Sequence, residues 1–232
     1  MKSTIISTVC SVILLFSLSN CGKTIDPTKA HPDVSGWPAL LEEDLSNAIY
    51  PEGVWTFENG ILTASEDQNL WTKKIYDNFV LDLEFMTAPE TNSGVIVYNE
   101  DMENWIPGSI EIQIADDHSE KWGSADPKWQ CGAVFGHLAP TKSMVKEPGE
   151  WNRYTITCID TMIYVVLNSE PIIEMNLNRW TSAETNPDGS EIPGWLSTPL
   201  AEVATQGRIG FQGKHGNAPI YFRNLRIKEL QK

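Results

Sequence analysis

Short strand-like segments separated by turn signals run through most of this chain, and they constrain its fold more than any other feature. The clearest is 79–85, where three apolar side chains alternate with Asp82 and Glu84, the period of a strand with one buried face. Further strands are expected at 55–57, 61–63, 95–98, 109–114, 154–159, 163–167, 208–212 and 220–227. Because no helices alternate with these strands, the pattern predicts an all-β fold, an antiparallel β-sandwich of the jelly-roll type.

Turn and helix signals complete this prediction. Asn59-Gly60 lies between two strand candidates and predicts a two-residue hairpin turn. Only 38–48 and 200–205 have a helical pattern, so one or two short helices are expected. The sequence shows no internal repeat and no linker between domains. Residues 37–232 are therefore expected to form a single jelly-roll domain.

The first twenty residues have the features of an export signal. Lys2 precedes a mostly apolar run at 5–18, which is too short to span a bilayer but suits the apolar region of a signal peptide. The run ends in Leu18-Ser19-Asn20-Cys21-Gly22, which resembles the bacterial lipobox. Residues 1–20 are therefore expected to be removed and Cys21 to carry a lipid. An ordinary secretory signal with a chance cysteine is the alternative.

A lipidated Cys21 predicts an exported protein anchored to the outer membrane. Residues 21–36 form a short polar segment that contains two prolines, so they are expected to form a tether. No acidic run follows Cys21, which favours the periplasmic face of the membrane over the cell surface.

Charge and cysteine content narrow the partners. The chain has 17 Lys and Arg against 31 Asp and Glu, a formal net charge of -14. Nucleic-acid binders need a basic face, so no nucleic-acid partner is expected. Once Cys10 and Cys21 are set aside, Cys131 and Cys158 could form one disulfide or remain two buried thiols. The cysteines do not have the spacing of zinc ligands.

The strand candidate at 109–114 carries the first functional signal. Its three isoleucines share one face, and Glu111 and Gln113 share the other, about 6.6–7 Å apart along the strand. Any half-solvated strand shows this pattern. A function is favoured because acids, an amide and an imidazole lie within a few residues of three tryptophans, which suits a sugar-binding cleft. These tryptophans are Trp105, Trp122 and Trp129.

One local resemblance points to glycoside hydrolysis. The run Glu111-Ile112-Gln113-Ile114-Ala115-Asp116 is similar to the E-x-D-x-x-E strand of laminarinase-type jelly-roll glucanases. Retaining hydrolysis needs two carboxyl groups about 5–5.5 Å apart. This chain departs from the motif at Gln113 and Asp116, which disfavours a laminarinase-like retaining mechanism.

Motifs spread over nearly the whole chain after the tether carry a second resemblance. They are Leu70-Trp71-Thr72, Tyr76-Asp77-Asn78-Phe79-Val80-Leu81, Asn92-Ser93-Gly94-Val95, Glu111-Ile112-Gln113, Gly132-Ala133-Val134-Phe135, Pro148-Gly149-Glu150-Trp151-Asn152, Gly207-Arg208-Ile209-Gly210-Phe211-Gln212 with His215-Gly216, and Tyr221-Phe222-Arg223-Asn224-Leu225-Arg226-Ile227. In this order they resemble the DUF1080 family, also called the 3-keto-disaccharide hydrolase domain. Where the family often has Phe-Arg after Asn-Ser-Gly, this chain has Val97-Tyr98. A substrate-binding arginine is therefore missing, and a different substrate preference is expected.

The resemblance implies a concanavalin A-like jelly roll in a bacterial lipoprotein that cleaves 3-keto-glycosides. A ketone at C3 acidifies the C2 hydrogen, so a base can remove it and the glycosidic oxygen can leave from C1. Water then adds, and the net result is hydrolysis of an oligosaccharide or glycoside. Such a site needs a general base, an electrophile at the enolate oxygen and an acid for the leaving group. A divalent metal could be that electrophile, and no organic cofactor is expected.

The candidate catalytic residues are Glu111, His215 and His137. Glu111 is the strongest candidate, as base or metal ligand. The two histidines could titrate near neutrality, although a lone histidine in a loop is usually only solvated. His215 is favoured over His137 because it follows a strand whose Gly210 and Gln212 share one face.

Candidate substrate contacts and metal ligands complete the set. The substrate contacts are expected from Gln113, Glu84, Gln212, Trp71, Trp122, Trp129 and Arg223. Asp116 and His118 have a spacing compatible with metal ligands, but such a run at a strand end more often forms a turn. The alternative for the whole chain is a non-catalytic carbohydrate-binding module, which would use the tryptophans and leave Glu111 idle.

Overall fold

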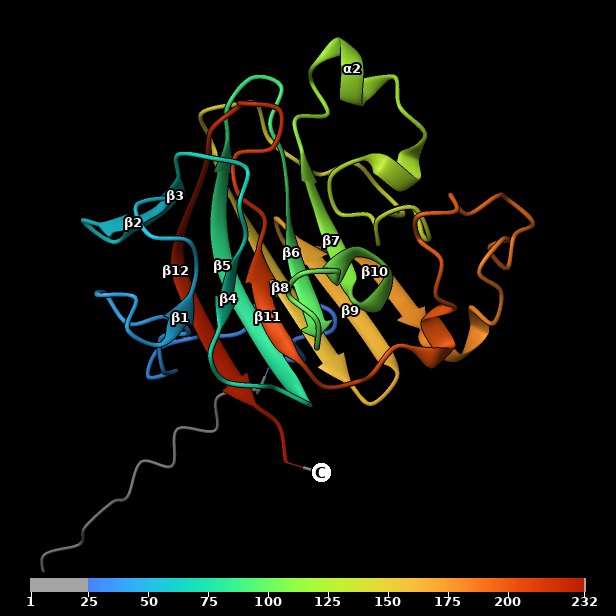
Figure 1. Cartoon of the computed structure of the whole chain (residues 1–232), viewed down its shortest axis with the longest axis horizontal. Helices are drawn as coiled ribbons and strands as arrows, with labels where there is room; N and C mark the ends of the chain where they lie inside the picture. The colour runs from blue at the N-terminus through green and yellow to red at the C-terminus, as the bar shows by residue number, and fades with distance from the viewer. Residues whose placement is uncertain (1–24, 232) are drawn as a thin grey trace, which may run out of the picture.

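Two antiparallel β-sheets stacked face to face make up the computed structural model, which describes residues 25–231 (Figure 1). The five-stranded sheet has the strand order β1 (Ala48–Ile49), β4 (Leu70–Thr72), β11 (Arg208–Phe211), β6 (Asn92–Asn99) and β7 (Ile110–Ala115). The seven-stranded sheet has the order β10 (Glu170–Asn176), β9 (Met162–Leu167), β8 (Trp151–Ile159), β5 (Phe79–Thr87), β12 (Ile220–Glu229), β3 (Ile61–Ala64) and β2 (Trp55–Glu58). The predicted all-β antiparallel sandwich is confirmed.

Helices are short and lie in the connections. The α-helical turns are α1 (Trp105–Gly108), between β6 and β7, and α2 (Glu120–Gly123). The 3-10 turns are η1 (Pro127–Trp129), η2 (Leu177–Arg179) and η3 (Leu200–Glu202). Within residues 25–231, none of the helices has the length and apolar character needed to cross a membrane.

One apolar core joins the two sheets. β5 and β7 each contribute every second residue to it, so the alternation predicted for 79–85 and 109–114 is confirmed. Aromatic pairs reach from sheet to sheet: the ring centroids of Phe79 and Tyr98 are 6.2 Å apart, and those of Phe211 and Phe222 are 5.0 Å apart. The predicted hairpin is also confirmed, because Asn59 and Gly60 link β2 to β3 with φ angles of 53° and 77°, as a type I′ turn requires.

The helix predicted for 38–48 is wrong. Leu40 is buried, as one face of a helix would be, but its N–H donates to the carbonyl of Leu225 on β12 at 3.0 Å. Leu45 has a φ of 55°, which a right-handed helix does not contain. Of the helix predicted for 200–205, only η3 forms. Pairing with a strand therefore replaces helical hydrogen bonds in the first of these segments.

β10 was not predicted because Pro171 interrupts its pattern. The pairing of β10 with β9 shifts register between Pro171 and Ile173. β10 is the last strand of its sheet, and edge strands tolerate a proline that a central strand would exclude. The sequence signal for this strand was therefore masked by a residue that its position makes harmless.

An N-terminal strap, residues 27–33, crosses the outer face of the seven-stranded sheet. The Arg153 guanidinium donates to the carbonyl of Pro32 at 2.9 Å. His31 Nδ1 lies 2.8 Å from Thr155 Oγ1. Because Arg153 and Thr155 both belong to β8, these contacts fix the strap to the middle of the sheet.

The strap shields a charged residue of the sheet from water. Asp82 of β5 faces away from the core, yet it is only 2% exposed, and it accepts hydrogen bonds from Arg153 and Thr155. The described part of the segment predicted as a tether, 21–36, therefore lies against the sheet. Cys21 and the predicted signal peptide lie outside the described residues.

Cys131 and Cys158 are free and buried, which is the second of the two alternatives given for them above. The sulfur of Cys131 lies 3.3 Å from the Tyr154 hydroxyl, which donates to the carbonyl of Gln113 at 2.8 Å. Tyr154 is on β8 and Gln113 is on β7, so this hydrogen bond joins the two sheets directly beneath the predicted site.

Replacing Tyr154 by phenylalanine is expected to lower the free energy of unfolding by about 1–2 kcal/mol, because a buried hydrogen bond is lost. Chemical denaturation measures the change. Tyr164→Phe is the matched control: Tyr164 is half-buried on β9, and its hydroxyl has no hydrogen bond to residues 25–231, so about 0.5 kcal/mol or less is expected. Equal losses in the two variants would contradict a role for the intersheet bond.

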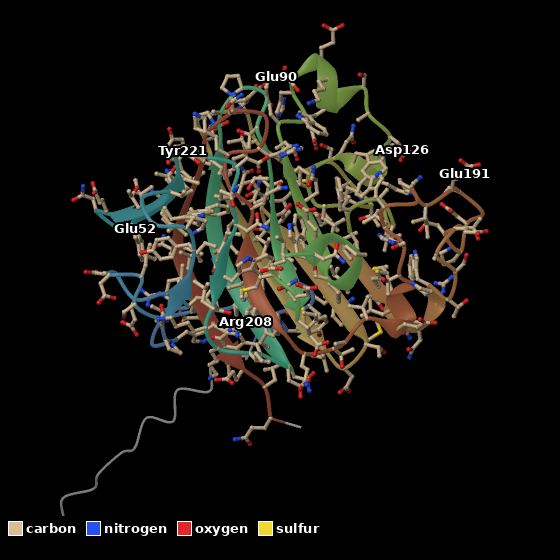
Figure 2. The ribbon with its side chains drawn as sticks, viewed as in Figure 1. Glu52, Glu90, Asp126, Glu191, Arg208 and Tyr221 are labelled. Carbon is tan, nitrogen blue, oxygen red and sulfur yellow. The ribbon has the colours of Figure 1, made fainter. Side chains whose placement is uncertain are left out.

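Most acidic side chains lie at the periphery of the molecule. Glu52, Glu90, Asp126 and Glu191 are all exposed and point outward (Figure 2). Within residues 25–231 the buried acids are Asp82, Glu111 and Asp116. A buried acid needs a compensating partner or a function, so these three indicate where a site could lie.

Candidate active site

Two glycines hollow the outer face of the five-stranded sheet. A Cβ atom at Gly94 of β6 would lie 2.1 Å from Oε1 of Glu111, and one at Gly210 of β11 would lie 2.3 Å from the ring of Trp71. Glu111 and Trp71 can therefore lie flat over neighbouring strands, where a larger residue beneath them would displace them. The cavity described below opens on this surface.

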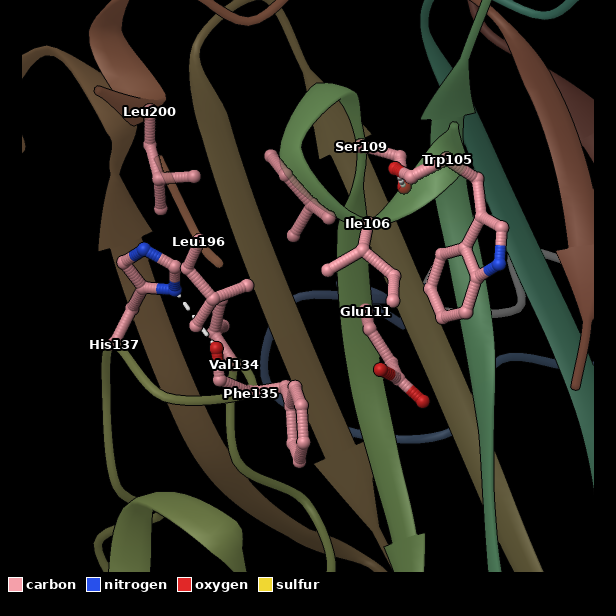
Figure 3. Close-up of a pocket in the computed structure, with 10 residues that line it drawn as sticks. Trp105, Ile106, Ser109, Glu111, Val134, Phe135, His137, Leu196 and Leu200 are labelled. Carbon is pink, nitrogen blue, oxygen red and sulfur yellow. Dashed lines mark hydrogen bonds between the residues drawn. The ribbon is translucent and has the colours of Figure 1, made fainter. Parts of the chain in front are cut away.

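Glu111 lies on the floor of the hollow and is 8% exposed. Its carboxyl group is flanked by Trp105 and Ile106 on one side and by Phe135 on the other (Figure 3). None of the described residues donates a hydrogen bond to it, and burial raises its pKa to about 8. At neutral pH Glu111 is therefore mostly a neutral carboxylic acid.

His215 is held at the rim by a carboxylate. Lys214 N–H donates to the carbonyl of Glu66 at 2.9 Å, and this contact brings the loop after β11 against the loop before β4. His215 Nδ1 lies 2.7 Å from Asp67 Oδ2. Because a carboxylate only accepts, the proton of a neutral His215 lies on Nδ1, and Nε2 is left as an acceptor for a substrate.

Asn92 supplies an oriented amide. The side-chain amide of Gln113 donates to Asn92 Oδ1 at 3.0 Å and to the carbonyl of Trp129 at 3.3 Å. Since Oδ1 is occupied, the Nδ2 group of Asn92 is the one that can donate into the cavity. Gln113, predicted to contact the substrate, is fully buried, so it lies beneath Asn92 and positions it.

These groups surround one cavity of about 160 Å³. Its lining residues are Asn92, Trp105, Ile106, Glu111, Phe135, Trp195, Gln212 and His215. A groove of about 720 Å³ adjoins it and shares Trp105, Ile106, Gln212 and His215, while Asp67, Gln68, Asn69, Trp71 and Tyr50 belong to the groove alone. Four predicted site residues, Glu111, His215, Gln212 and Trp71, are thus brought together.

His137 does not line this cavity, but together with Glu111 it lines an adjoining space of about 10 Å³. Its Nδ1 is 2.7 Å from the carbonyl of Phe135, and its ring faces Leu196 and Leu200, away from the carboxyl of Glu111 (Figure 3). Burial lowers its pKa, although the hydrogen bond to Phe135 opposes this. The structure therefore presents His137 as a neutral histidine beside the apolar residues behind the site.

The predicted tryptophans have three different environments. Trp71 is buried over Gly210, with its ring 6.2 Å from that of Trp105. Trp129 packs against Phe135 at 4.7 Å, one layer from the cavity. Trp122 lies on α2 under the Lys121 ammonium and lines neither the cavity nor the groove.

Glu84 and Arg223 lie on the opposite sheet. Arg223 Nε donates to Glu84 Oε2 at 2.5 Å, and the guanidinium lies 3.9 Å from the ring centroid of Trp151. These residues belong to β5, β12 and β8 of the seven-stranded sheet, so they cannot contact a substrate held by Glu111. Their contacts are those of an ion pair that stabilises the sheet surface.

Asp116 and His118 do not offer free metal ligands. The two carboxylate oxygens of Asp116 accept the N–H groups of Glu90 and His118. His118 Nε2 lies 3.1 Å from the carbonyl of Val145, and Nδ1 lies 3.3 Å from a Glu147 oxygen. Within residues 25–231 no three His, Cys, Asp or Glu side chains are grouped for a metal ion. The donor atoms at this strand end therefore do not fit a divalent cation.

Six residues of the site were not among the predicted site residues: Asn92, Trp105, Ile106, Phe135 and Trp195, which line the cavity, and Asp67, which binds His215. Asn92 could have been found, because Asn92-Ser93-Gly94 is one of the motifs that carry the family resemblance. Asp67, Phe135 and Trp195 lie in loops, and their relation to Glu111 depends on tertiary contacts. No local pattern in the sequence pairs Asp67 with His215.

Comparisons with known proteins agree with this fold. A family model described as a 3-keto-alpha-glucoside-1,2-lyase-like domain matches residues 29–228. No curated protein matches the sequence. The crystal structure of a candidate glycosyl hydrolase from Parabacteroides distasonis is 51% identical, with a TM-score of 0.82, and covers 84% of this chain and 99% of that chain.

Two more distant structures are similar in fold alone. A second candidate glycosyl hydrolase from P. distasonis is 22% identical, with a TM-score of 0.61, over 85% of this chain and 90% of that chain. The exoplasmic/lumenal domain of VIP36, in its Ca²⁺/Man3GlcNAc-bound form, is 8% identical, with a TM-score of 0.50, over 84% of this chain and 89% of that chain.

Proposed function

Because the chain belongs to the 3-keto-alpha-glucoside-1,2-lyase-like family, we propose that it cleaves glycosides whose sugar carries a ketone at C3. The cleavage is an elimination followed by addition of water. The observation that carries the proposal is one cavity that combines a buried carboxyl group, an imidazole held by a carboxylate, and an oriented amide. These are Glu111, the His215–Asp67 pair and Asn92.

His215 is the proposed base. Asp67 holds the Nδ1 proton, so the Nε2 lone pair is directed to the substrate and can take the hydrogen from C2. Asp67 also stabilises the imidazolium that results, as the carboxylate of a catalytic triad does. The amide Nδ2 of Asn92 donates to the ketone oxygen and stabilises the negative charge that develops there.

Glu111 is the proposed acid. Its buried carboxyl group holds a proton at neutral pH and can give it to the glycosidic oxygen as the bond to C1 breaks. The sequence alone favoured Glu111 as a base or a metal ligand. The reversal follows from burial, because no cation or hydrogen-bond donor among the described residues offsets the loss of water around the carboxylate.

The proton transfers balance over the cycle. The C2 hydrogen passes to His215, the electron pair forms the C1–C2 double bond, and the glycosidic oxygen leaves with the proton of Glu111. Water then adds to C1 and gives a proton to the Glu111 carboxylate. The His215 imidazolium, which is 47% exposed, exchanges the hydrogen taken from C2 with the solvent and then gives a solvent-derived proton to C2. The two residues recover their starting states, and the net change is hydrolysis.

A retaining glucanase is the less supported alternative. Such an enzyme needs two carboxyl groups about 5–5.5 Å apart across the glycosidic bond. Among the described residues that line the cavity, Glu111 is the sole carboxyl. The groove adds Asp67, which is bound to His215, and Glu103. The site is therefore better suited to elimination.

A disaccharide labelled with deuterium at C2, in its 3-keto form and in its unoxidised form, tests the proposal. The purified protein is expected to cleave the keto form alone, and mass spectrometry is expected to show loss of the label at a rate matching cleavage. The control is the rate at which the keto form loses its C2 deuterium to the solvent in the absence of protein. Cleavage with retention of the label would indicate direct hydrolysis and contradict the proposal, and binding without cleavage would indicate a carbohydrate-binding module. If a chelator abolished cleavage and an added divalent cation restored it, a metal rather than Asn92 would stabilise the charge on the ketone oxygen.

The pH dependence of kcat/KM is expected to reflect Glu111. An acid must be protonated to act, so kcat/KM should fall as the pH rises through about 8, by about tenfold per pH unit at higher pH. A pH profile of initial rates, corrected for the spontaneous reaction of the keto sugar, measures this. A rate that rises through the same range would contradict an acid role and support a base.

Gly94→Ala is expected to lower kcat/KM by about 10- to 100-fold, because its Cβ would occupy the place of Oε1 of Glu111 and shift the carboxyl group. Steady-state kinetics and the melting temperature measure the two consequences. Gly108→Ala is the matched control, since a Cβ there meets open space. Equal kinetics in the two variants would show that the position of Glu111 is not critical.

The lipid anchor predicted at Cys21 remains a proposal that the sequence alone supports. We propose attachment to the outer membrane, on its periplasmic face. Fractionation of cells that express the wild type or Cys21→Ala tests it. The wild type is expected in the membrane fraction and the variant in the soluble fraction. Equal distribution of the two would contradict anchoring.

A further inference from the structure

We propose that the apolar end of the cavity receives an aromatic aglycone, so that the preferred substrates are 3-keto-glycosides of aromatic alcohols. The inference rests on the proposed function and names the substrate class of the same site. It is carried by an aromatic wall, formed by Trp129, Phe135 and Trp195, that borders the cavity beside Glu111.

The wall is a three-ring cluster with one face open. The centroid of Phe135 is 4.7 Å from that of Trp129 and 5.7 Å from that of Trp195, and Trp129 and Trp195 are 5.9 Å apart. Phe135 and Trp195 line the cavity, while Trp129 supports them from behind. A planar ring entering the cavity could stack on this cluster.

The wall is held in place by contacts outside the cavity. Asn186 donates to the carbonyl of Gly136 at 3.2 Å and accepts from the indole N–H of Trp180 at 3.0 Å, which ties the loop that carries Trp195 to the turn that carries Phe135. Gly136 has a φ of 72°, and a Cβ there would lie 2.4 Å from Leu196 and 3.0 Å from Trp129. The two segments are therefore packed closely enough to form a preformed surface.

The open face of the wall is unusual for this protein. Within residues 25–231, four large hydrophobic side chains are exposed: Ile25, Ile75, Ile106 and Trp195. Two of these, Ile106 and Trp195, line the cavity that contains Glu111, and Trp195 is 50% exposed. Exposed apolar groups concentrated at a site indicate a binding surface rather than incidental exposure.

The two ends of the cleft differ in chemistry. The groove end has a mixed lining: the hydrogen-bonding side chains Asp67, Gln68, Asn69, Gln212 and His215 lie beside the rings of Tyr50, Trp71 and Trp105. Such a combination suits a sugar, whose hydroxyl groups need hydrogen-bond partners and whose ring can pack on an aromatic side chain. The wall end presents Phe135, Trp195 and Ile106, which would leave sugar hydroxyls without partners. The keto sugar is therefore assigned to the groove, and a less polar group to the wall.

Glu111 lies where the two ends meet. Phe135 lies at the outer edge of β7, where its N–H donates to the carbonyl of Glu111, and Trp195 packs against it. Gln212 and His215 follow β11, which lies on the other side of β7, beyond β6. An acid that protonates the glycosidic oxygen must lie between the sugar and the aglycone. The order of sugar, Glu111 and aglycone along the cleft thus agrees with the proposed chemistry and assigns the aglycone to the aromatic wall.

Three 3-keto-glucosides test the inference, with methyl, cyclohexylmethyl and benzyl aglycones. All three leave as primary alkoxides, so differences in kcat/KM report mainly on contacts of the aglycone. The benzyl compound is expected to exceed the methyl compound by about 10- to 50-fold and to exceed the cyclohexylmethyl compound, because a planar ring stacks on the wall. Equal values for the three would overturn the inference and leave the proposed function intact.

Variants of Trp195 localise the effect. Trp195→Ala is expected to remove most of the benzyl advantage, so that the ratio of kcat/KM for the benzyl and methyl compounds falls close to one. Trp195→Phe should retain most of it, and Ile75→Ala, at an exposed position away from the cleft, should change neither value. An equal loss for the methyl and benzyl compounds in Trp195→Ala would overturn the inference.

Failure of the proposed function gives a different result. If the wild type cleaves none of the three keto compounds, the catalytic proposal fails. Calorimetry with unoxidised benzyl and methyl glucosides then tests the wall by itself. Tighter binding of the benzyl compound that Trp195→Ala abolishes supports an aromatic subsite, and equal affinities overturn it.

Discussion

Glu111→Gln is expected to lower kcat/KM for a 3-keto-disaccharide about a thousandfold, yet to leave a 3-keto-glucoside of nitrophenol within about tenfold of wild type. Glutamine keeps the shape of the side chain but has no proton to give. A sugar alkoxide leaves slowly without that proton, whereas a nitrophenolate leaves readily as an anion. Steady-state kinetics with the two substrates measures the difference.

The comparison of substrates also separates the two roles considered for Glu111. If the carboxyl group removed the C2 proton, both substrates would lose the same factor, because that step does not depend on the leaving group. Glu84→Gln is the matched control, since Glu84 belongs to the opposite sheet, and it is expected to have wild-type kinetics. Equal thousandfold losses on both substrates would contradict an acid role.

His215→Gln is expected to lower kcat/KM by about a thousandfold on every substrate, the nitrophenyl compound included, because the base is lost. Asp67→Asn should have a smaller effect, about a hundredfold, because the imidazole remains but its Nδ1 proton is no longer held by a charged partner. Exchange of the C2 deuterium, followed by mass spectrometry, should be lost in parallel with cleavage in the two variants.

His118→Gln is the control for the histidine. His118 also pairs with a carboxylate, Glu147, at 3.3 Å, but it lies outside the cavity and the groove. It is expected to leave cleavage and exchange unchanged. If His118→Gln and His215→Gln reduced the rate equally, the pairing of an imidazole with a carboxylate would be a structural feature only, and the assignment of the base to His215 would be wrong.

Alternation made much of the fold predictable. The inward side chains of β5 and β7 and the hairpin at Asn59-Gly60 depend on local periodicity and turn geometry, which the sequence records directly. The prediction for 38–48 was wrong because Leu41, Leu45 and Ala48 have the i, i+4, i+7 spacing of a helical face. The pairing of Leu40 with β12 is a long-range contact that no local pattern contains.

The site was predictable only in part. The alternation of side chains along β7 places Glu111 and Gln113 on the face opposite the core. That alternation does not reveal that Gln113 is covered by Asn92 while Glu111 reaches the cavity. His137 and His215 both follow strand-like runs, and only the tertiary structure separates the one buried behind the cavity from the one paired with Asp67.

The N-terminal strap and the candidate active site lie on opposite sides of the molecule. The strap lies on the outer face of the seven-stranded sheet, whereas Glu111 opens on the outer face of the five-stranded sheet. Five residues lie between Cys21 and Pro27, whose carbonyl is beside Thr157 on β8. This stretch of chain can span at most about 22 Å. If Cys21 carries a lipid, so short a segment would hold the outer face of the seven-stranded sheet toward the bilayer. The opening of the cleft would then face the surrounding water. Soluble glycosides could then diffuse in directly, without passing between the protein and the lipid surface.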